Sequence, residues 1–184
     1  REIVARFPDG GAGDVDAAVQ AARKAFPGWA GASPELRSDL LDKVGHIILE
    51  RRETLGKLLA REEGKTLPEA MGEVARAGRI FKYFAGEALR RHGRNMDSTR
   101  PGLEAATIRE AVGVFGVIAP WNFPIAIPAW KTAPALAFGN TVVLKPAGPT
   151  PATAHAMAAI IHEAGAPAGI FNLVLGRGQV GDAI

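Results

Sequence analysis

The segment PWNFP, residues 120–124, holds the side chain in this sequence that is best suited to chemistry, the amide of Asn122. Two prolines restrict the backbone around it, because a proline ring fixes its own φ angle. A neutral N–H donor held in place can stabilise an oxygen atom that gains negative charge during a reaction. From these residues alone the simpler interpretation is favoured, an ordinary asparagine in a turn.

Lys145 is a second side chain that could meet a ligand. It follows an apolar run and precedes a proline, so we expect it at the carboxyl end of a β-strand. Open parallel sheets bind ligands beyond that end of their strands, and an ammonium group offers three donors. A solvated lysine at the end of a strand is the alternative.

The segment GRGQVG, residues 176–181, has the form G-x-G-x-x-G. In an ordinary Rossmann fold this loop places a pyrophosphate at the amino terminus of the next helix. Here the loop follows the third predicted strand of the second half rather than the first. Its position therefore argues against the ordinary Rossmann interpretation.

Metal and triad chemistry find no support in the sequence. It contains no cysteine, and its four histidines, at positions 46, 92, 155 and 162, lack partners at metal-ligand spacing. His155 and His162 lie seven residues apart on one predicted helix, which is typical of a helix face. We predict no metal site and no Ser-His-Asp set.

Helical patterns fill the first half of the chain. We expect one helix from Val15 to about Phe26, capped by Asp14. A second begins at Ser33-Pro34, where a cap residue precedes a proline in the first helical position. Its pattern continues to Gly64, a residue suited to ending a helix. The expected apolar stripe is Leu36, Leu40, Leu41, Val44, Ile47, Ile48, Leu55, Leu58 and Leu59.

A longer helix is expected from about Pro68 to His92, with Gly93 ending it. The apolar residues repeat at helical spacing along one face. We expect that face to bury Met71, Val74, Phe81, Phe84, Ala88 and Leu89.

The pattern changes after Gly93. A polar, turn-rich connection (95–102) leads to the predicted strands, at 105–110, 113–119, 141–145 and 170–175, with helices at 124–138 and 150–165. Strands that alternate with helices predict an α/β fold with a parallel sheet. The run 113–119 is nearly all apolar, which is typical of a strand covered on both faces. Three segments (120–124, 145–148 and 176–181) should meet at the carboxyl edge of this sheet.

The run GVFGVIAPWNFPIAIPAWKTAPALAFGNTVVLKPA, residues 113–147, resembles the aldehyde dehydrogenase superfamily in the order and spacing of PWNFP, WK, PALA, GN and VVLKP. Weaker similarity, including FNLVLG, covers nearly the whole chain. The resemblance implies a Rossmann-like parallel sheet of the aldehyde dehydrogenase type. It further implies three parts: a helical amino-terminal part of the cofactor domain (1–92), an oligomerisation arm (93–111) and a βαβαβ part of the NAD(P)-binding domain (112–184).

The resemblance also implies roles for individual residues. Asn122 matches the amide that holds the oxyanion of a thiohemiacetal intermediate, and Lys131 matches a lysine near the active site that is otherwise a helix-surface residue. Lys145 matches a lysine that contacts the adenosine ribose of NAD or NADP. The expected cofactor-binding positions are Ile118, Ala119, Pro120, Trp121, Lys145, Ala147, Gly148 and Gly178.

Gly148 departs from the family pattern, in which many members have a glutamate that accepts hydrogen bonds from the ribose hydroxyls. A carboxylate would repel a 2′-phosphate, because like charges disfavour each other in a partly buried site. Glycine removes both the hydrogen bond and the repulsion. We therefore expect the full enzyme to accept NADP, alone or alongside NAD.

In the resembling family a cysteine thiolate attacks the aldehyde, a hydride passes to the nicotinamide, and a glutamate activates the water that releases the acid. A chain without cysteine cannot supply that nucleophile. We therefore expect an inactive fragment of a longer aldehyde dehydrogenase, truncated before the catalytic domain. The segments STRPG and WNFPIAIPAWK resemble those of aldehyde dehydrogenase branches that oxidise semialdehydes carrying a carboxylate, such as 2-oxoglutarate or succinate semialdehyde. Arg79 or Lys82 on the long helix could meet that carboxylate, but a solvated helix residue is the favoured interpretation of each.

The composition of the chain argues against some classes of binding partner. The 184 residues carry a net charge of +3, with 47% hydrophobic and 22% charged residues. Basic residues alternate with acids along the helices, so nucleic acid is not an expected partner. No apolar run could span a membrane and no signal peptide is recognisable, so we expect a cytoplasmic protein. By family resemblance, residues 95–111 pair with another subunit in a homodimer or homotetramer.

Three other functions fit parts of the sequence. A stand-alone nucleotide-binding module would bind NAD(P) without catalysis. An ordinary Rossmann dehydrogenase would depend on Gly178 rather than on Lys145. A structural piece without a ligand would not respond to either cofactor.

Overall fold

The computed structural model describes residues 5–90 and 93–184, and its centre is a parallel sheet of three strands. The strands β3 (Val114–Ile118), β4 (Thr141–Lys145) and β5 (Phe171–Leu173) lie in the order β3-β4-β5, with Ile118 opposite Lys145. Helices α5 (Ala126–Ala137) and α6 (Pro151–Glu163) connect them. The predicted α/β alternation is confirmed, and β4 has the bounds that the sequence indicated.

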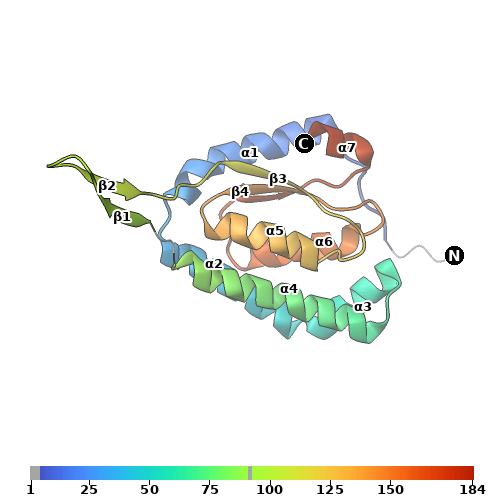
Figure 1. Ribbon diagram of the computed structural model, residues 1–184. Helices are drawn as coiled ribbons and strands as arrows, with labels where there is room; N and C mark the ends of the chain where they lie inside the picture. The colour runs from blue at the N-terminus through green and yellow to red at the C-terminus, as the bar shows by residue number, and fades with distance from the viewer. Residues whose placement is uncertain (1–4, 91–92) are drawn as a thin grey trace.

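Helices cover the sheet on both faces (Figure 1). One face carries α1 (Ala12–Ala30) and the short α7 (Gly178–Ala183), and the other carries α5 and α6. Outside α5 and α6 lies a further layer of three helices, α2 (Pro34–Glu50), α3 (Arg52–Glu63) and α4 (Leu67–Ala88). The helical first half is therefore not one unit, because α1 packs on the sheet while α2 to α4 pack on its helices.

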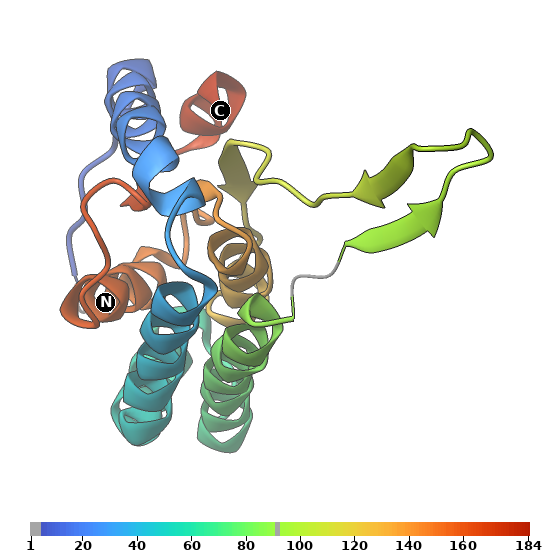
Figure 2. The same cartoon turned by 90° about the vertical axis from the view of Figure 1, so that its left-hand side faces the viewer.

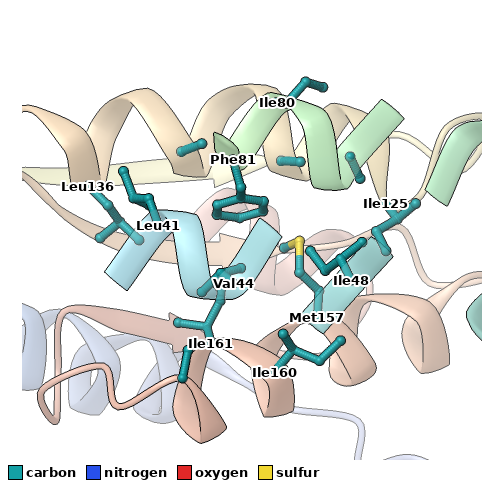
Figure 3. Close-up of a cluster of buried hydrophobic side chains, with 14 of the residues drawn as sticks. Leu41, Val44, Ile48, Ile80, Phe81, Ile125, Leu136, Met157, Ile160 and Ile161 are labelled. Carbon is teal, nitrogen blue, oxygen red and sulfur yellow. The ribbon is translucent and has the colours of Figure 1, made fainter. Parts of the chain in front are cut away.

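The main core lies between the outer helices and the sheet (Figure 3). Leu41 and Ile48 of α2 and Phe81 of α4 are fully buried there, together with Met157 of α6. A smaller cluster on the opposite face joins α1 to the sheet through Val15, Ala22, Val143, Val174 and Val180. Each buried aliphatic side chain of this size contributes roughly 1.5–3 kcal/mol through removal from water.

Local signals account for most helix ends. Ser33 accepts a hydrogen bond from the backbone N–H of Leu36 at 3.1 Å, as its predicted cap role requires. Gly64 ends α3 with a φ angle of 93°, which favours glycine. The first helix differs from the prediction, because Gly11 is the cap residue and Asp14 lies inside the helix. Asp14 accepts the N–H of Gly11 at 2.9 Å and so stabilises the same turn from a position three residues on.

Three predictions of burial were wrong. Leu36 and Leu89 are exposed, at 49% and 59% of their surface. Leu36 lies in the first turn of α2, and Leu89 is the cap residue that follows α4. In β3, predicted to be covered on both faces, only Val117 is buried among the five strand residues. The reason is its place at the edge of the sheet, whereas β4 has a strand on each side and all five of its residues are buried.

A two-stranded antiparallel hairpin projects from this body (Figure 2). It consists of β1 (Arg94–Asp97) and β2 (Glu104–Thr107). The predicted connection at 95–102 therefore contains part of a strand, and the predicted strand at 105–110 ends at Thr107. The expected helix end near His92 lies outside the described residues.

The structure gives a role to the Gly139-Asn140 pair, the GN of the sequence motif. The side-chain oxygen of Asn140 accepts the backbone N–H groups of Val112 (2.7 Å) and Gly113 (3.0 Å), and its side-chain nitrogen donates to the carbonyl oxygen of Ala135. Gly139 turns the chain into β4 with a φ angle of 85°. These two residues join the start of β3, the end of α5 and the start of β4.

No helix among the described residues combines the length and the hydropathy needed to cross a bilayer.

Candidate functional site

The three segments expected to bind a ligand meet at the carboxyl edge of the sheet. The backbone N–H of Ala119 donates to the carbonyl oxygen of Lys145 at 3.0 Å, so the loops after β3 and β4 leave the sheet side by side. The backbone N–H of Val174 donates to the carbonyl oxygen of Leu144 at 2.9 Å, which brings the loop after β5 to the same edge. This is the edge at which open α/β sheets bind ligands.

A cavity of about 300 Å³, here called the Gly148 hollow, opens between the loops after β4 and β5. Ala147, Gly148 and Gly176 line it, together with residues 7–9 from the other end of the chain. No heavy atom lies within 4 Å of the place where a Cβ of Gly148 would stand. The hollow therefore has open space at the position where the sequence departs from the family pattern.

The amino-terminal segment forms one wall of this hollow, which the sequence did not indicate. The backbone N–H of Gly10 donates to the carbonyl oxygen of Leu175 at 2.9 Å, and the guanidinium of Arg177 lies 3.3 Å from the Asp9 carboxylate. A Cβ on Gly10 would stand 2.6 Å from the same carbonyl oxygen. This contact joins residues about 165 positions apart, so no local signal marks it.

Lys145 is largely buried at the end of β4, with 8% of its surface exposed. A Cβ placed on Gly181 would lie at ordinary van der Waals distance from the Lys145 stem and from the side chain of Ile118. Among residues 5–90 and 93–184, no side chain or carbonyl accepts a hydrogen bond from the Lys145 ammonium group. A desolvated cation without an acceptor is costly, and an anionic or hydroxylated ligand would offset that cost.

The glycines of residues 176–181 have different roles. A Cβ on Gly176 would stand 2.4 Å from a methyl carbon of Val180, so this glycine permits close packing within the loop. No heavy atom lies within 4 Å of a Cβ placed on Gly178, which begins the six-residue helix α7. The structure thus accounts for Gly176 by packing, and it brings Gly178 into neither the Gly148 hollow nor contact with Lys145.

The two long crossover helices do not offer free amino termini. Glu62 of α3 accepts the backbone N–H of Ala152 at 2.5 Å and that of Thr153 at 2.9 Å, at the start of α6. Glu73 of α4 accepts the N–H groups of Ile125 and Ala126 at 3.0 and 3.1 Å, at the start of α5. In an ordinary Rossmann fold, such amides bind the pyrophosphate. Here carboxylates from the outer helices already occupy them.

The PWNFP loop presents its central side chains to the surface. Trp121 and Phe123 are 56% and 45% exposed, and Asn122 is exposed as well, whereas Pro124 is buried. The ammonium group of Lys65 donates to the backbone carbonyl oxygen of Asn122 at 3.1 Å. Lys65 and Glu73 were absent from the sequence-based site. A buried charged residue on the apolar face of the long helix, next to Val74, is the signal that could have revealed Glu73.

Lys131 lies elsewhere. It is exposed on α5 and lines a second cavity of about 490 Å³ with Trp130 and the β3 residues 115–118. Ile118 therefore belongs to the same cavity as Lys131, while Pro120 is exposed beside the PWNFP loop and Ala119 is buried. No described contact joins Lys131 to Asn122 or to Lys145.

Within the described ranges, no group of three potential metal ligands is found.

The family is decided by comparison with known proteins. A model of the aldehyde dehydrogenase family matches residues 1–184. The chain belongs to the aldehyde dehydrogenase family. Within it, the chain is 46% identical over 179 residues to an alpha-ketoglutaric semialdehyde dehydrogenase of Bacillus subtilis (strain 168), a match that covers 97% of the chain and 37% of the relative. The chain thus spans little more than a third of the length of that relative.

Two solved structures carry the same fold as this aldehyde dehydrogenase chain. An NADP-dependent enzyme from E. coli superposes with a TM-score of 0.96 at 38% identity, covering 98% of the chain and 38% of that protein. Betaine aldehyde dehydrogenase from Staphylococcus aureus in complex with NAD+ gives a TM-score of 0.96 at 37% identity, covering 99% of the chain and 37% of that protein. The Rossmann-like α/β fold of the aldehyde dehydrogenase type is thereby confirmed.

Proposed function

We propose that this chain is the cofactor-binding portion of an enzyme that oxidises an aldehyde to a carboxylic acid with NAD or NADP. The observation that carries the proposal is the shared edge of the sheet. There the Asn122 loop, the buried Lys145 and the Gly148 hollow lie on adjacent loops, in a chain of the aldehyde dehydrogenase family. One edge thus combines a neutral donor for the reacting oxygen with a cation and a cavity for a nucleotide.

The residues present fit a dinucleotide. The ammonium group of Lys145 has no acceptor among the described residues and would donate to the hydroxyl groups of a ribose. Ala147 and Gly148 would border the same sugar, since both line the hollow and follow Lys145 in the loop after β4. Ile118, Ala119, Pro120 and Trp121 would line the path toward Asn122, and Gly178 would lie on the adenine side. A bound NAD or NADP would supply the hydride acceptor for the oxidation.

Acceptance of NADP is part of the proposal. The open space at Gly148 leaves room for a 2′-phosphate, which a glutamate at this position would repel. Arg61 lines an adjoining cavity of about 410 Å³ that Glu62, Gly148 and Pro149 also border. The Glu62 carboxylate is already bound to the amides at the start of α6, so the Arg61 guanidinium would be the group that meets such a phosphate. One similar structure is an NADP-dependent enzyme and another contains NAD+, so both cofactors occur among relatives of this fold.

Asn122 would act on the substrate. An aldehyde attacked by a thiolate develops negative charge on its oxygen, and the side-chain N–H of Asn122 would stabilise that charge. The 184 residues contain no cysteine, so we propose that the nucleophile and the base that activates water come from residues outside these 184. Lys131 stays a prediction as an active-site residue, because it lines a different cavity.

The proposed substrates are semialdehydes that carry a carboxylate, as in the name of the Bacillus subtilis relative. Arg79 lines a cavity of about 540 Å³ with Arg76, Tyr83 and Trp130, and this pair of guanidinium groups beside aromatic rings suits a carboxylate. Lys82, the other sequence-based choice, lies 2.5 Å from the Asp42 carboxylate and is less available. Arg79 is therefore the better choice of the two.

Assembly through the β1–β2 hairpin is also proposed. All four residues of β1 are exposed, and the projecting hairpin has edge backbone groups that a strand from a second copy could pair with (Figure 2). Pairing in a homodimer or homotetramer would satisfy these backbone groups.

The division of the chain at residues 92 and 111 and a cytoplasmic location stay predictions.

The test is an assay of the full-length protein with a panel of aldehydes and each cofactor, in parallel with its intact mass and thiol count. Reduction of NAD or NADP that depends on a carboxylate-bearing semialdehyde and on a reactive thiol would support the proposal. Binding of NAD(P) without oxidation of any aldehyde would favour the stand-alone nucleotide-binding module. Absence of cofactor binding would contradict both.

A further inference from the structure

A buried ion pair lies behind the PWNFP loop. The ammonium group of Lys65 is 2.6 Å from the Glu73 carboxylate, and these side chains are 13% and 2% exposed. The carboxylate of Glu63, 11% exposed, lies 3.5 Å from the same ammonium group, so Lys65 is balanced by two acids. Lys65 lies between α3 and α4, and Glu73 lies in the second turn of α4. Buried ion pairs contribute little net stability, because desolvation opposes the attraction between the charges. The contacts around the pair point to a different role.

Glu73 holds the carboxyl end of the loop. One carboxylate oxygen accepts the backbone N–H groups of Ile125 and Ala126, while the other accepts a hydrogen bond from Lys65. Ile125 is the cap residue of α5 and Ala126 its first residue. A carboxylate at this position satisfies amides that have no partner within the helix, and it complements the positive end of the helix dipole.

Lys65 holds the middle of the loop. Its ammonium group donates to the backbone carbonyl oxygen of Asn122 at 3.1 Å and lies 4.6 Å from the centre of the Phe123 ring. Among the residues that the structure describes, Lys65 and Glu73 are the side chains that hydrogen-bond the backbone between Asn122 and Ala126. Trp121 and Phe123 are 56% and 45% exposed, so packing covers only part of these two side chains.

We propose that Lys65 and Glu73 are positioning residues, which hold the backbone of Asn122 so that its side-chain amide points at the developing oxyanion. This inference rests on the proposed function. The effect would be large, because an oxyanion donor must be held in place before the reaction begins. A shift of about 1 Å in a catalytic group can lower the rate by roughly 100-fold.

Steady-state kinetics of the full-length protein test the proposal. We expect Lys65→Met to lower kcat by roughly 10- to 100-fold and to change the KM for the aldehyde by less than about threefold, since the lost interaction acts in the transition state. Lys65→Arg keeps the charge and the donors, so it should restore most of the lost kcat. Lys57→Met is the matched control, because Lys57 on α3 forms an exposed pair with Glu53 instead.

A double-mutant cycle separates positioning from general destabilisation. If Lys65 acts through Asn122, Lys65→Met should cost less than about threefold in a protein that already carries Asn122→Ala. A cost that stays the same in both backgrounds overturns the proposal. So does a kcat that Lys65→Met leaves unchanged.

Hydrogen exchange gives a second test that does not need activity. In Glu73→Ala we expect exchange at the amides of Ile125 and Ala126 to accelerate by at least about tenfold, with the β4 amides unchanged, because Glu73 is the acceptor of both amides. Equal acceleration throughout the sheet, or none at these two amides, overturns the proposal. Local acceleration in a protein that oxidises no aldehyde would support the hold on the loop and overturn the proposed function instead.

Discussion

The backbone N–H of Ala119 donates to the carbonyl oxygen of Lys145 at 3.0 Å, at the carboxyl end of two neighbouring parallel strands. This bond joins the start of the PWNFP loop to the residue proposed to bind the cofactor. The reacting carbonyl and the nucleotide would therefore be positioned from one rigid edge. The two loops nevertheless carry different chemistry, so substitutions in each should affect different steps.

Asn122→Ala should abolish most turnover while leaving cofactor binding nearly intact. Loss of one oxyanion donor lowers kcat by roughly 100- to 1000-fold, and the dissociation constant of NAD(P) should change by less than about twofold. Steady-state kinetics and a fluorescence titration on the full-length protein measure these two quantities. A kcat within about threefold of the parent would contradict the assigned role.

Lys145→Ala should have the opposite profile. Loss of a charge-assisted hydrogen bond costs about 1.5–3 kcal/mol, so the dissociation constant of the cofactor should rise by roughly 10- to 100-fold. Titration calorimetry measures this. Gly178→Ala is the informative comparison, because open space surrounds Gly178 and we expect little change in binding. The reverse result, with Gly178→Ala harmful and Lys145→Ala harmless, would support an ordinary Rossmann loop.

Gly148→Glu should move cofactor preference toward NAD. The new carboxylate would meet ribose hydroxyl groups and would repel a 2′-phosphate, which at about 4 Å and intermediate dielectric is worth several kcal/mol before screening. We expect the ratio of kcat/KM for NAD to that for NADP to rise by at least about tenfold. The melting temperature should not change, since the space is open. A strong preference for NAD in the parent that this substitution leaves unaltered would contradict the prediction.

Acid should weaken the start of α4. Hydrogen bonds from the hydroxyl and backbone N–H of Thr66 lower the pKa of Glu69. A carboxyl group whose pKa is lower in the folded state adds stability above its unfolded pKa, and that contribution is lost as the pH falls through the folded value. Urea unfolding of the parent and of Glu69→Gln should therefore differ near neutral pH and converge only in acid, as the pH falls through the lowered pKa of Glu69. A difference that persists in acid would contradict this account.

Local sequence determined much of the fold. β4 has its predicted bounds because the short apolar run Val142–Leu144 lies between Asn140-Thr141 and a lysine followed by a proline. The start of α2 follows from Ser33, and the end of α3 from Gly64, because caps depend on residues within one turn. The alternation of strand and helix then predicted the parallel sheet and its ligand-binding edge, and the motifs in 113–147 predicted the family.

Tertiary structure alone decided which side chains support that edge. Glu73 meets the amides of Ile125 and Ala126 across more than 50 residues, and Glu62 meets the start of α6 across about 90. The pairing of Gly10 with Leu175 and the exposure of β3 likewise depend on which elements become neighbours. Periodicity and capping report interactions within a few residues. Long-range partners are chosen when packed helices bring charges and unpaired amides together, because a buried polar group must find an acceptor or donor wherever the fold provides one.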